Sequence, residues 1–257
     1  MPTDASLDDD LGLAHELATR ATRIALRSFG RPIARREKPD GSPVTDVDVE
    51  IERRLVDALR QARPADGSWG EELGARGARD RRWILDPIDG TANFIAGSDH
   101  WGTHVALECD GEVVLGLITR PARDRLWWAV RGRGAFAAAA TAPVGSGSRL
   151  RVSATSRLEA ARVALWSNSP HPIADRLAGR AELVSSNLDA VLSLAEGGVD
   201  AVIDPNGKPW DFAPAVVLVE EAGGRFSNAH GRRDITRGEG CFSNGLIHDE
   251  LVRCLAG

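Results

Sequence analysis

The sequence predicts an α/β protein in which an α+β lobe is followed by an α/β lobe. Two stretches with apolar residues at helical spacing precede three strand-like runs in the first half. In the second half, short strand-like and helix-like stretches alternate, which is typical of α/β folds. A chain of 257 residues can bury a large core, either as one domain or as two lobes that share an interface. We place the lobes at residues 1–145 and 146–257.

The first half opens with two predicted helices. The first covers Leu7–Phe29, where apolar residues recur at helical spacing until Gly30-Arg31-Pro32 ends the pattern. The second covers Thr45–Ala62, and its apolar face is formed by Val47, Ile51, Leu55 and Leu59. Residues 70–80 are rich in Gly and Arg, and we expect a mobile surface loop there.

Strands are predicted in the middle of the chain. Trp83-Ile84-Leu85 is typical of the end of a buried strand, and further strands are expected at 103–109, 113–119 and 126–130. Asp110-Gly111 joins two of them as a hairpin turn. Residues 137–148 are rich in Ala, Gly and Ser, which indicates a lobe boundary with little structure of its own.

The second half alternates between strands and helices. The strands are expected at residues 162–166, 182–186, 199–203 and 241–243. The helices are expected at residues 173–178, 188–196, 210–222 and 246–255. A pair of glycines follows two of these helices, as is common where helices end.

Composition and charge exclude several classes of protein. The chain is 42% hydrophobic and 27% charged, and its net charge of −5 argues against a nucleic-acid or anionic membrane surface. The three cysteines are far apart and form no C-x-x-C pair, so we expect no zinc site and no disulfide framework. The acidic N-terminus is unlike a signal peptide, and no apolar run approaches the ~20 residues that span a bilayer. A cytoplasmic protein is therefore expected.

Two carboxylates stand at the turn that follows the buried strand. Asp86 and Asp89 are three residues apart, with Pro87 fixing the backbone between them and Gly90-Thr91 at the tip of the turn. Crowded carboxylates repel one another unless a cation neutralises them, and Asp and backbone oxygens suit a hard ion such as Mg²⁺. The alternative is that D-P-x-D-G is simply good turn chemistry.

Three further acidic residues are candidates for the same site. Glu71 lies in Gly70-Glu71-Glu72, and Asp211 lies at the start of a predicted helix. Asp48 follows Pro43-Val44-Thr45 by three residues. Each also has a structural explanation: a solvated loop for Glu71, a first-turn acid favoured by the helix dipole for Asp211, and a capping box for Asp48.

Together, the motifs resemble those of the inositol monophosphatase superfamily of Mg²⁺-dependent phosphatases. They occur in order along nearly the whole chain: Pro43-Val44-Thr45-x-x-Asp48, Gly70-Glu71-Glu72, Asp86-Pro87-Ile88-Asp89-Gly90-Thr91-x-Asn93-Phe94, Arg131-Gly132-Arg133-Gly134-Ala135-Phe136, Trp210-Asp211 and Glu221-Ala222-Gly223-Gly224. The resemblance implies the layered αβαβα sugar-phosphatase fold, with the active site between the lobes. It also implies a homodimer.

The resemblance assigns metal ligands residue by residue. Glu71, Asp86 and the backbone carbonyl of Ile88 would hold a first Mg²⁺, and Asp86 would bridge to a second that Asp89 and Asp211 complete. A third ion would bind near Glu71 and Glu72, which gives two to three Mg²⁺ per site. Lys38 falls near a lysine of the family.

The resemblance also assigns the catalytic and phosphate-binding groups. Thr91, hydrogen-bonded to Asp48, would orient and help deprotonate the attacking water, with Glu71 completing the catalytic set. The backbone N–H groups of Gly90 and Thr91 would hold the phosphate. This matches the physics of phosphoryl transfer, where positioning and charge stabilisation supply most of the catalysis.

The implied substrate is a small soluble phosphate monoester. Residues 126–136 and 243–250 look most like the histidinol-phosphate phosphatase branch, whose substrate is a cationic amino alcohol. Residues 184–189 (Val-Ser-Ser-Asn-Leu-Asp) depart from the Gly-Asp of that branch and from the Gly-Thr-Ala of the inositol branch. Asn187 stands at the position that would contact substrate, and Asp204 stands where the family usually has a glutamate. Asp89 and Asp211 would belong to the same substrate site.

Alternatives to histidinol phosphate remain open. The substrate could instead be inositol 1-phosphate, a sugar phosphate or a nucleoside phosphate. Trp101 could line the pocket or belong to the core. A different class of function is a catalytically silent relative that serves as a binding or regulatory subunit, although such relatives usually lose metal carboxylates or the threonine that this chain keeps.

Overall fold

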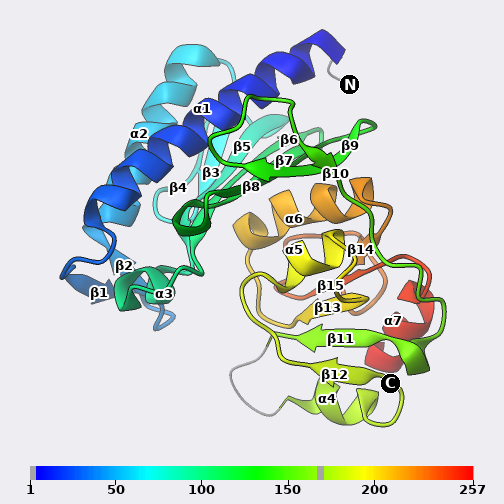
Figure 1. Ribbon diagram of the computed structural model, residues 1–257. Helices are drawn as coiled ribbons and strands as arrows, with labels where there is room; N and C mark the ends of the chain where they lie inside the picture. Colours follow the sequence, from blue (N-terminus) through cyan, green and yellow to red (C-terminus); the bar gives the residue numbers. More distant parts are fainter. Residues whose placement is uncertain (1–3, 167–170, 257) are drawn as a thin grey trace.

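Helices and sheets alternate in five layers, in the order α, β, α, β, α (Figure 1). The computed structural model describes residues 4–166 and 171–256, so the first three residues of the acidic N-terminus lie outside it. The outer layer is formed by α1 (Asp4–Ser28) and α2 (Asp46–Ala62). The middle helical layer is α5 (Ala190–Ala195) and α6 (Pro209–Glu221), and the last is α4 (Pro172–Leu177) and α7 (His248–Ala256). This layering confirms the expected fold class.

An eight-stranded sheet separates the first two helical layers. Its strands follow the order β10 (Ser148–Arg149), β9 (Gly134–Ala139), β8 (Arg125–Val130), β7 (Glu112–Arg120), β6 (Gly102–Cys109), β5 (Arg81–Asp89), β3 (Gly67–Gly70) and β4 (Gly74–Arg76). Only β3 and β5 pair in parallel, and all the other pairs are antiparallel.

A five-stranded sheet separates the middle and last helical layers. Its order is β12 (Glu182–Val184), β11 (Arg162–Leu165), β13 (Ala201–Asp204), β15 (Gly240–Ser243) and β14 (Arg225–Ser227). The first three strands are parallel, and β15 is antiparallel to both of its neighbours. The remaining elements are the hairpin of β1 (Arg35–Glu37) and β2 (Pro43–Thr45), the short helix α3 (Thr91–Ala96) and two 3₁₀ turns, Pro121–Arg123 and Leu158–Ala160.

The two long N-terminal helices form as their apolar spacing predicts. On α1, Leu17, Ala21 and Ala25 are fully buried against the first sheet. Helix α2 begins after Thr45, whose side chain accepts hydrogen bonds from two backbone N–H groups in the first turn. The Thr45 N–H in turn donates a hydrogen bond to the Asp48 carboxylate, so the capping box offered by the sequence is present.

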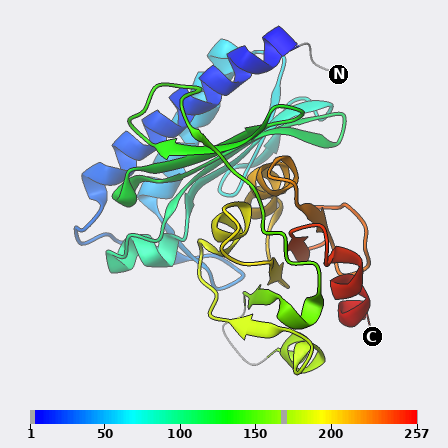
Figure 2. The ribbon, with the colours of Figure 1, turned by 45° about the vertical axis from the view of Figure 1, so that its right-hand side comes forward.

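Helix α6 holds the two sheets together. Residues 212–219 are all buried, because both sheets pack against this helix (Figure 2). A helix that is apolar on all sides belongs inside a protein rather than at its surface. Its N-terminal turn, which carries Asp211, is therefore held at the junction between the sheets.

The expectation of loops was wrong in two places. Residues 74–76 form β4, which pairs with β3 instead of standing free, and residues 137–139 continue β9. These strands are rich in glycine and alanine and lack the alternating apolar pattern from which a strand is predicted. They form because their backbones pair with neighbouring strands. The helix expected at 188–196 is regular only over Ala190–Ala195. No helix among residues 4–166 and 171–256 is long and apolar enough to cross a membrane.

Candidate active site

Strand β5 carries two buried carboxylates at its carboxyl end. Asp86 is 2% exposed and Asp89 is 8% exposed. The pairing with β6 is irregular between them: Asp86 lies opposite His104, and Asp89 lies opposite Gly102. This local break allows two acidic side chains three residues apart to lie at the same edge of the sheet.

Four carboxylates from three parts of the chain converge at this edge. Burial, followed by the negative charges of Glu71, Asp89 and Asp211, raises the pKa of Asp86 well above its usual value. Burial and the charge of Asp89 do the same to the pKa of Asp211. Asp211 also lines one cavity with Asp89 and a second with Glu71. The structure thus brings Glu71, Asp86, Asp89 and Asp211 together, as the sequence analysis expected.

Asp89 differs from its neighbours because the side-chain nitrogens of His104 and Arg120 face it. Burial alone would raise its pKa, but His104 and then Arg120 hold the pKa of Asp89 below its usual value. The Nε2 atom of His104 lies 3.0 Å from Asp89 Oδ2, and an Nη atom of Arg120 lies 3.2 Å from the same oxygen. Asp89 therefore stays ionised in this acidic surrounding.

The residues at this edge fit a hard divalent cation. Among the described residues, Asp86 Oδ1 is buried and makes no hydrogen bond, whereas Asp89 Oδ2 contacts His104 and Arg120. One ligand atom each from Asp86, Asp89 and His104 lies within 4.8 Å of the others. Unbonded buried polar atoms are costly, and a cation bound by carboxylate oxygens would remove both this cost and the mutual repulsion.

The segment after β3 holds Glu71 beside a lysine. Lys38 Nζ lies 2.6 Å from both Glu71 Oε1 and Glu72 Oε1. Burial lowers the pKa of Lys38, but the two ion pairs outweigh it and hold this pKa above its usual value. Beneath the segment, the fully buried carboxylate of Glu52 accepts hydrogen bonds from the N–H groups of Glu72 (2.8 Å) and Leu73 (2.9 Å).

Thr91, the first residue of α3, contacts Asp48 in the first turn of α2. Thr91 Oγ1 lies 3.0 Å from Asp48 Oδ1 and 3.0 Å from the carbonyl oxygen of Ile88. Gly90 precedes Thr91 with φ 82°, and a Cβ atom there would lie 2.7 Å from Leu188 Cδ2. Only glycine meets both requirements, because other residues rarely adopt this φ and the space is occupied.

A cavity of about 260 Å³ opens beside Asp89 and Asp211. Asn187 and Asp204 also line it, over an apolar floor that includes Val202, Phe212, Ala215 and Phe242. Asp204 lies at the end of β13, where burial raises its pKa to about 6. Its Oδ1 accepts a hydrogen bond from the Asn206 N–H at 2.9 Å. Of the residues predicted for substrate binding, Asp89, Gly90, Asn187, Asp204 and Asp211 line this cavity, and Thr91 is not among its lining residues.

Trp101 belongs to the core. It is fully buried, and its ring packs against Phe29 and Phe94 with centroid distances of 5.1 Å and 4.8 Å. Of the two alternatives for Trp101, the structure supports a place in the core and not one in the pocket lining.

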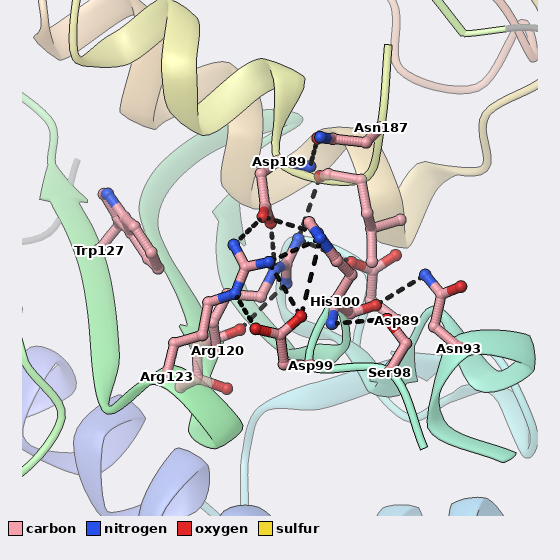
Figure 3. Close-up of polar contacts among 12 residues, drawn as sticks. Asp89, Asn93, Ser98, Asp99, His100, Arg120, Arg123, Trp127, Asn187 and Asp189 are labelled. Atoms are coloured by element: carbon pink, nitrogen blue, oxygen red, sulfur yellow. Dashed lines mark hydrogen bonds and ion pairs between the residues drawn. The ribbon is translucent and has the colours of Figure 1, made fainter. Parts of the chain in front are cut away.

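Sequence reasoning missed two nitrogen-bearing side chains at the site, those of His104 and Arg120. The sequence motifs predict roles only for acidic and neutral residues there and for Lys38. His104 reaches the site because it pairs with Asp86 across the sheet, and Arg120 because it ends the neighbouring strand β7. The segment between β5 and β6 contains the helix α3, so no short hairpin turn fixes the register of this pair. Figure 3 shows Arg120 beside Asp189, together with Arg123 and His100.

Comparison with known proteins gives a consistent family. The model of the inositol monophosphatase family matches residues 6–256. A Streptomyces griseus protein named glucose-1-phosphate thymidylyltransferase is 48% identical over 230 residues, which is 87% of each chain. The histidinol-phosphatase of Streptomyces coelicolor is 38% identical over 257 residues, covering 95% of this chain and 96% of the relative.

Solved structures agree with the fold. An inositol monophosphatase from Zymomonas mobilis superposes with a TM-score of 0.82 at 30% identity, covering 97% of this chain and 98% of that one. The carboxylate cluster described above is in keeping with a metal-dependent family. This chain belongs to the inositol monophosphatase family and is a phosphoric monoester hydrolase.

Proposed function

We propose that the protein is a Mg²⁺-dependent phosphatase that hydrolyses a small phosphate monoester, with histidinol phosphate as the favoured substrate. The observation that carries this proposal is the convergence of Glu71, Asp86, Asp89 and Asp211 beside a cavity of about 260 Å³. Carboxylates arranged in this way attract a divalent cation and, through it, a phosphate dianion.

The residues at the edge of β5 would hold two to three Mg²⁺ ions. Glu71, Asp86, Asp89, Asp211 and the carbonyl of Ile88 are the proposed ligands. When bound, the ions supply positive charge that acidifies water and neutralises phosphate oxygens. The ionised forms of Asp86 and Asp211, which burial and neighbouring negative charges disfavour, would be stabilised most by this charge.

Thr91 and Asp48 supply the base that a water nucleophile needs. The Thr91 hydroxyl donates its proton to Asp48 Oδ1, which leaves an oxygen lone pair of Thr91 to accept a proton from water. Asp48 Oδ2 is held by the Thr45 N–H at 2.9 Å, so the carboxylate cannot rotate away. The backbone N–H groups of Gly90 and Thr91 are the proposed phosphate donors.

The charges around the cavity favour a cationic leaving group. The described residues that line it include three carboxylates, those of Asp89, Asp204 and Asp211, and no lysine or arginine, and the one histidine among them, His104, faces Asp89. Asp204 is not one of the proposed metal ligands, and we propose that its carboxylate pairs with an ammonium or imidazolium group. A cationic amino alcohol such as histidinol has these groups, and relatives with the histidinol-phosphatase name support the same choice.

Other substrates are kept as alternatives. Relatives named inositol-1-monophosphatase favour a cyclitol phosphate, and the sugar phosphate in the name of the Streptomyces griseus relative favours a sugar ester. A nucleoside phosphate and a catalytically silent role are tested by the same assay. The homodimer and the cytoplasmic location expected from the sequence stay predictions.

A phosphate-release screen with Mg²⁺ tests the proposal. The substrates are histidinol phosphate, inositol 1-phosphate, glucose 1-phosphate and adenosine monophosphate, and a separate reaction offers glucose 1-phosphate with a thymidine nucleoside triphosphate. We expect the highest kcat/KM with histidinol phosphate. Release of phosphate from another ester would replace the substrate but keep the chemistry. Pyrophosphate release with no phosphatase activity, or no activity at all, would contradict the proposal.

A further inference from the structure

Arg120 is a buried cation that touches both lobes. It ends β7, and its side chain is 1% exposed. Its Nε donates to Asp189 Oδ1 at 2.7 Å, and its two Nη atoms donate to the carbonyls of Thr119 (3.0 Å) and Leu188 (3.1 Å). The second Nη also lies 3.2 Å from Asp89 Oδ2. One guanidinium thus joins a proposed metal ligand to a segment that lines the cavity.

The backbone of β6 leaves room for this guanidinium. A Cβ atom on Gly102 would lie 2.6 Å from an Nη atom of Arg120 and 1.7 Å from the Thr119 carbonyl oxygen. Glycine is therefore needed at this position, since any side chain would displace both groups.

Asp189 is the counter-ion on the other lobe. Besides the bond from Arg120, its carboxylate accepts a hydrogen bond from Arg123 Nη1 at 2.6 Å and lies 3.0 Å from His100 Nδ1 (Figure 3). Its own N–H donates to Asn187 Oδ1 at 2.8 Å. This bond uses the amide oxygen of Asn187, so the amide nitrogen is the group that Asn187 offers to a ligand.

We propose that Arg120 is a positioning residue that holds Asp89 and the segment 187–189 in one arrangement, with Asp189 as its counter-ion. The proposal rests on the proposed function, because it gives Asp89 and Asn187 their roles. A buried ion pair is costly unless its partners are all present, so removing one charge disturbs the others. Asp189 is consequently committed to Arg120 and does not bind the leaving group.

Both charges are expected to affect metal affinity. In Asp189→Asn, the positive charge of Arg120 would be balanced by Asp89 alone and would compete with a cation there. In Arg120→Lys, the single ammonium cannot reach Asp189 and the two carbonyls together, so Asp89 and the segment 187–189 would lose their common support. Groups that orient a metal ligand typically contribute 10–100-fold to metal affinity or activity.

Titration of the full-length protein with Mn²⁺ by calorimetry tests this directly. We expect the dissociation constant to rise about ten-fold in Asp189→Asn and in Arg120→Lys. The matched control is Glu196→Gln, which removes the Arg125–Glu196 ion pair (2.8 Å). That pair also joins the first sheet to the end of α5 but has no contact with Asp89, so Mn²⁺ affinity should not change.

Hydrolysis of two substrates tests the role of Asp189. Histidinol phosphate is the cationic substrate and glycerol 2-phosphate the neutral one. If Asp189 only positions Arg120, Asp189→Asn changes kcat/KM for both by the same factor. A rise in KM confined to histidinol phosphate would show that Asp189 binds the leaving group, and would overturn the proposal.

The two readouts separate this proposal from the proposed function. If the wild-type protein hydrolyses neither ester but Mn²⁺ affinity falls in both variants and not in Glu196→Gln, the positioning role stands without the phosphatase assignment. A change in Mn²⁺ affinity below about two-fold in both variants overturns the positioning role, because supporting groups contribute far more. If Arg120→Lys does not fold, shown by its melting curve, Asp189→Asn decides the outcome.

Discussion

Thr91 Oγ1 lies 3.0 Å from Asp48 Oδ1, although 43 residues separate them in the sequence. The second carboxylate oxygen of Asp48 is held at the start of α2 by Thr45, so the capping box of this helix also orients the proposed base. The structural explanation of Asp48 is confirmed, and the proposed functional one is compatible with it, because a different carboxylate oxygen serves each.

Replacing Thr91 separates turnover from metal binding. In Thr91→Ala we expect kcat to fall by roughly 10²–10⁴-fold, the usual contribution of a general base. Mn²⁺ affinity should be mostly retained, because the Thr91 side chain is not among the proposed ligands. Thr91→Ser keeps the hydroxyl and is the control, with activity close to wild type. Loss of Mn²⁺ binding in the alanine variant would show that the role of Thr91 is misassigned.

Replacing Asp89 distinguishes an enzyme from a silent relative. Asp89→Ala removes a proposed ligand, so Mg²⁺-dependent phosphate release should disappear while the circular dichroism spectrum stays unchanged. The control is Asp110→Asn in the turn between β6 and β7, where φ is 51° and asparagine is well tolerated. Full activity in Asp89→Ala would exclude the proposed metal centre.

The order of elements follows from the sequence, but the weakly patterned strands do not. Helix α2 and strand β5 can be predicted from the spacing of their apolar residues and from the motifs at their ends. Strand β3, Gly67–Gly70, has two glycines and no alternation, and it exists because β5 and β4 pair with it. No local pattern in residues 67–70 predicts a strand, because its pairing partners are set by the whole sheet.

The same limit applies to the site. The four carboxylates could be predicted because each stands in a recognisable motif. The contact of Arg120 with Asp189 joins residues 69 positions apart for which no motif predicts a pairing, and it depends on how the segment before α5 packs against the end of β7. Long-range ion pairs of this kind become visible only in the folded chain.

Asp204 is expected to set the preference for a cationic leaving group. In Asp204→Asn, KM for histidinol phosphate should rise about ten-fold, as the loss of one charge-assisted hydrogen bond implies, while KM for glucose 1-phosphate changes little. Because burial raises the pKa of Asp204 to about 6, its carboxylate gains a proton as the pH falls through this value. KM for histidinol phosphate should rise more steeply over the same range in the wild type than in the variant, because the substrate's own phosphate and imidazole titrate there in both. Equal KM changes for both substrates would argue against this role.

His248 makes stability depend on pH. It is fully buried between Ser227 and Ser243, at 2.9 Å and 2.8 Å, and burial lowers its pKa from 6.5 to about 4. Between these values the unfolded chain binds a proton that the folded protein does not, so the free energy of unfolding falls as the pH drops from 6.5 to about 4. The loss should be on the order of 2 kcal/mol.

Urea unfolding at several pH values measures this effect. His248→Gln should flatten the pH dependence in this range. His230→Gln, which changes an exposed histidine, should leave the slope as in the wild type. An unchanged slope in His248→Gln would assign the effect to other groups.

The central claim is that Glu71, Asp86, Asp89 and Asp211 gather divalent cations. Anomalous diffraction from crystals of the protein soaked in Mn²⁺ tests it most directly, because it locates the ion without reference to activity. We predict an anomalous peak between Asp86, Asp89 and Asp211, with a second toward Glu71. Crystals that bind Mn²⁺ elsewhere and show no peak among these carboxylates would contradict the account.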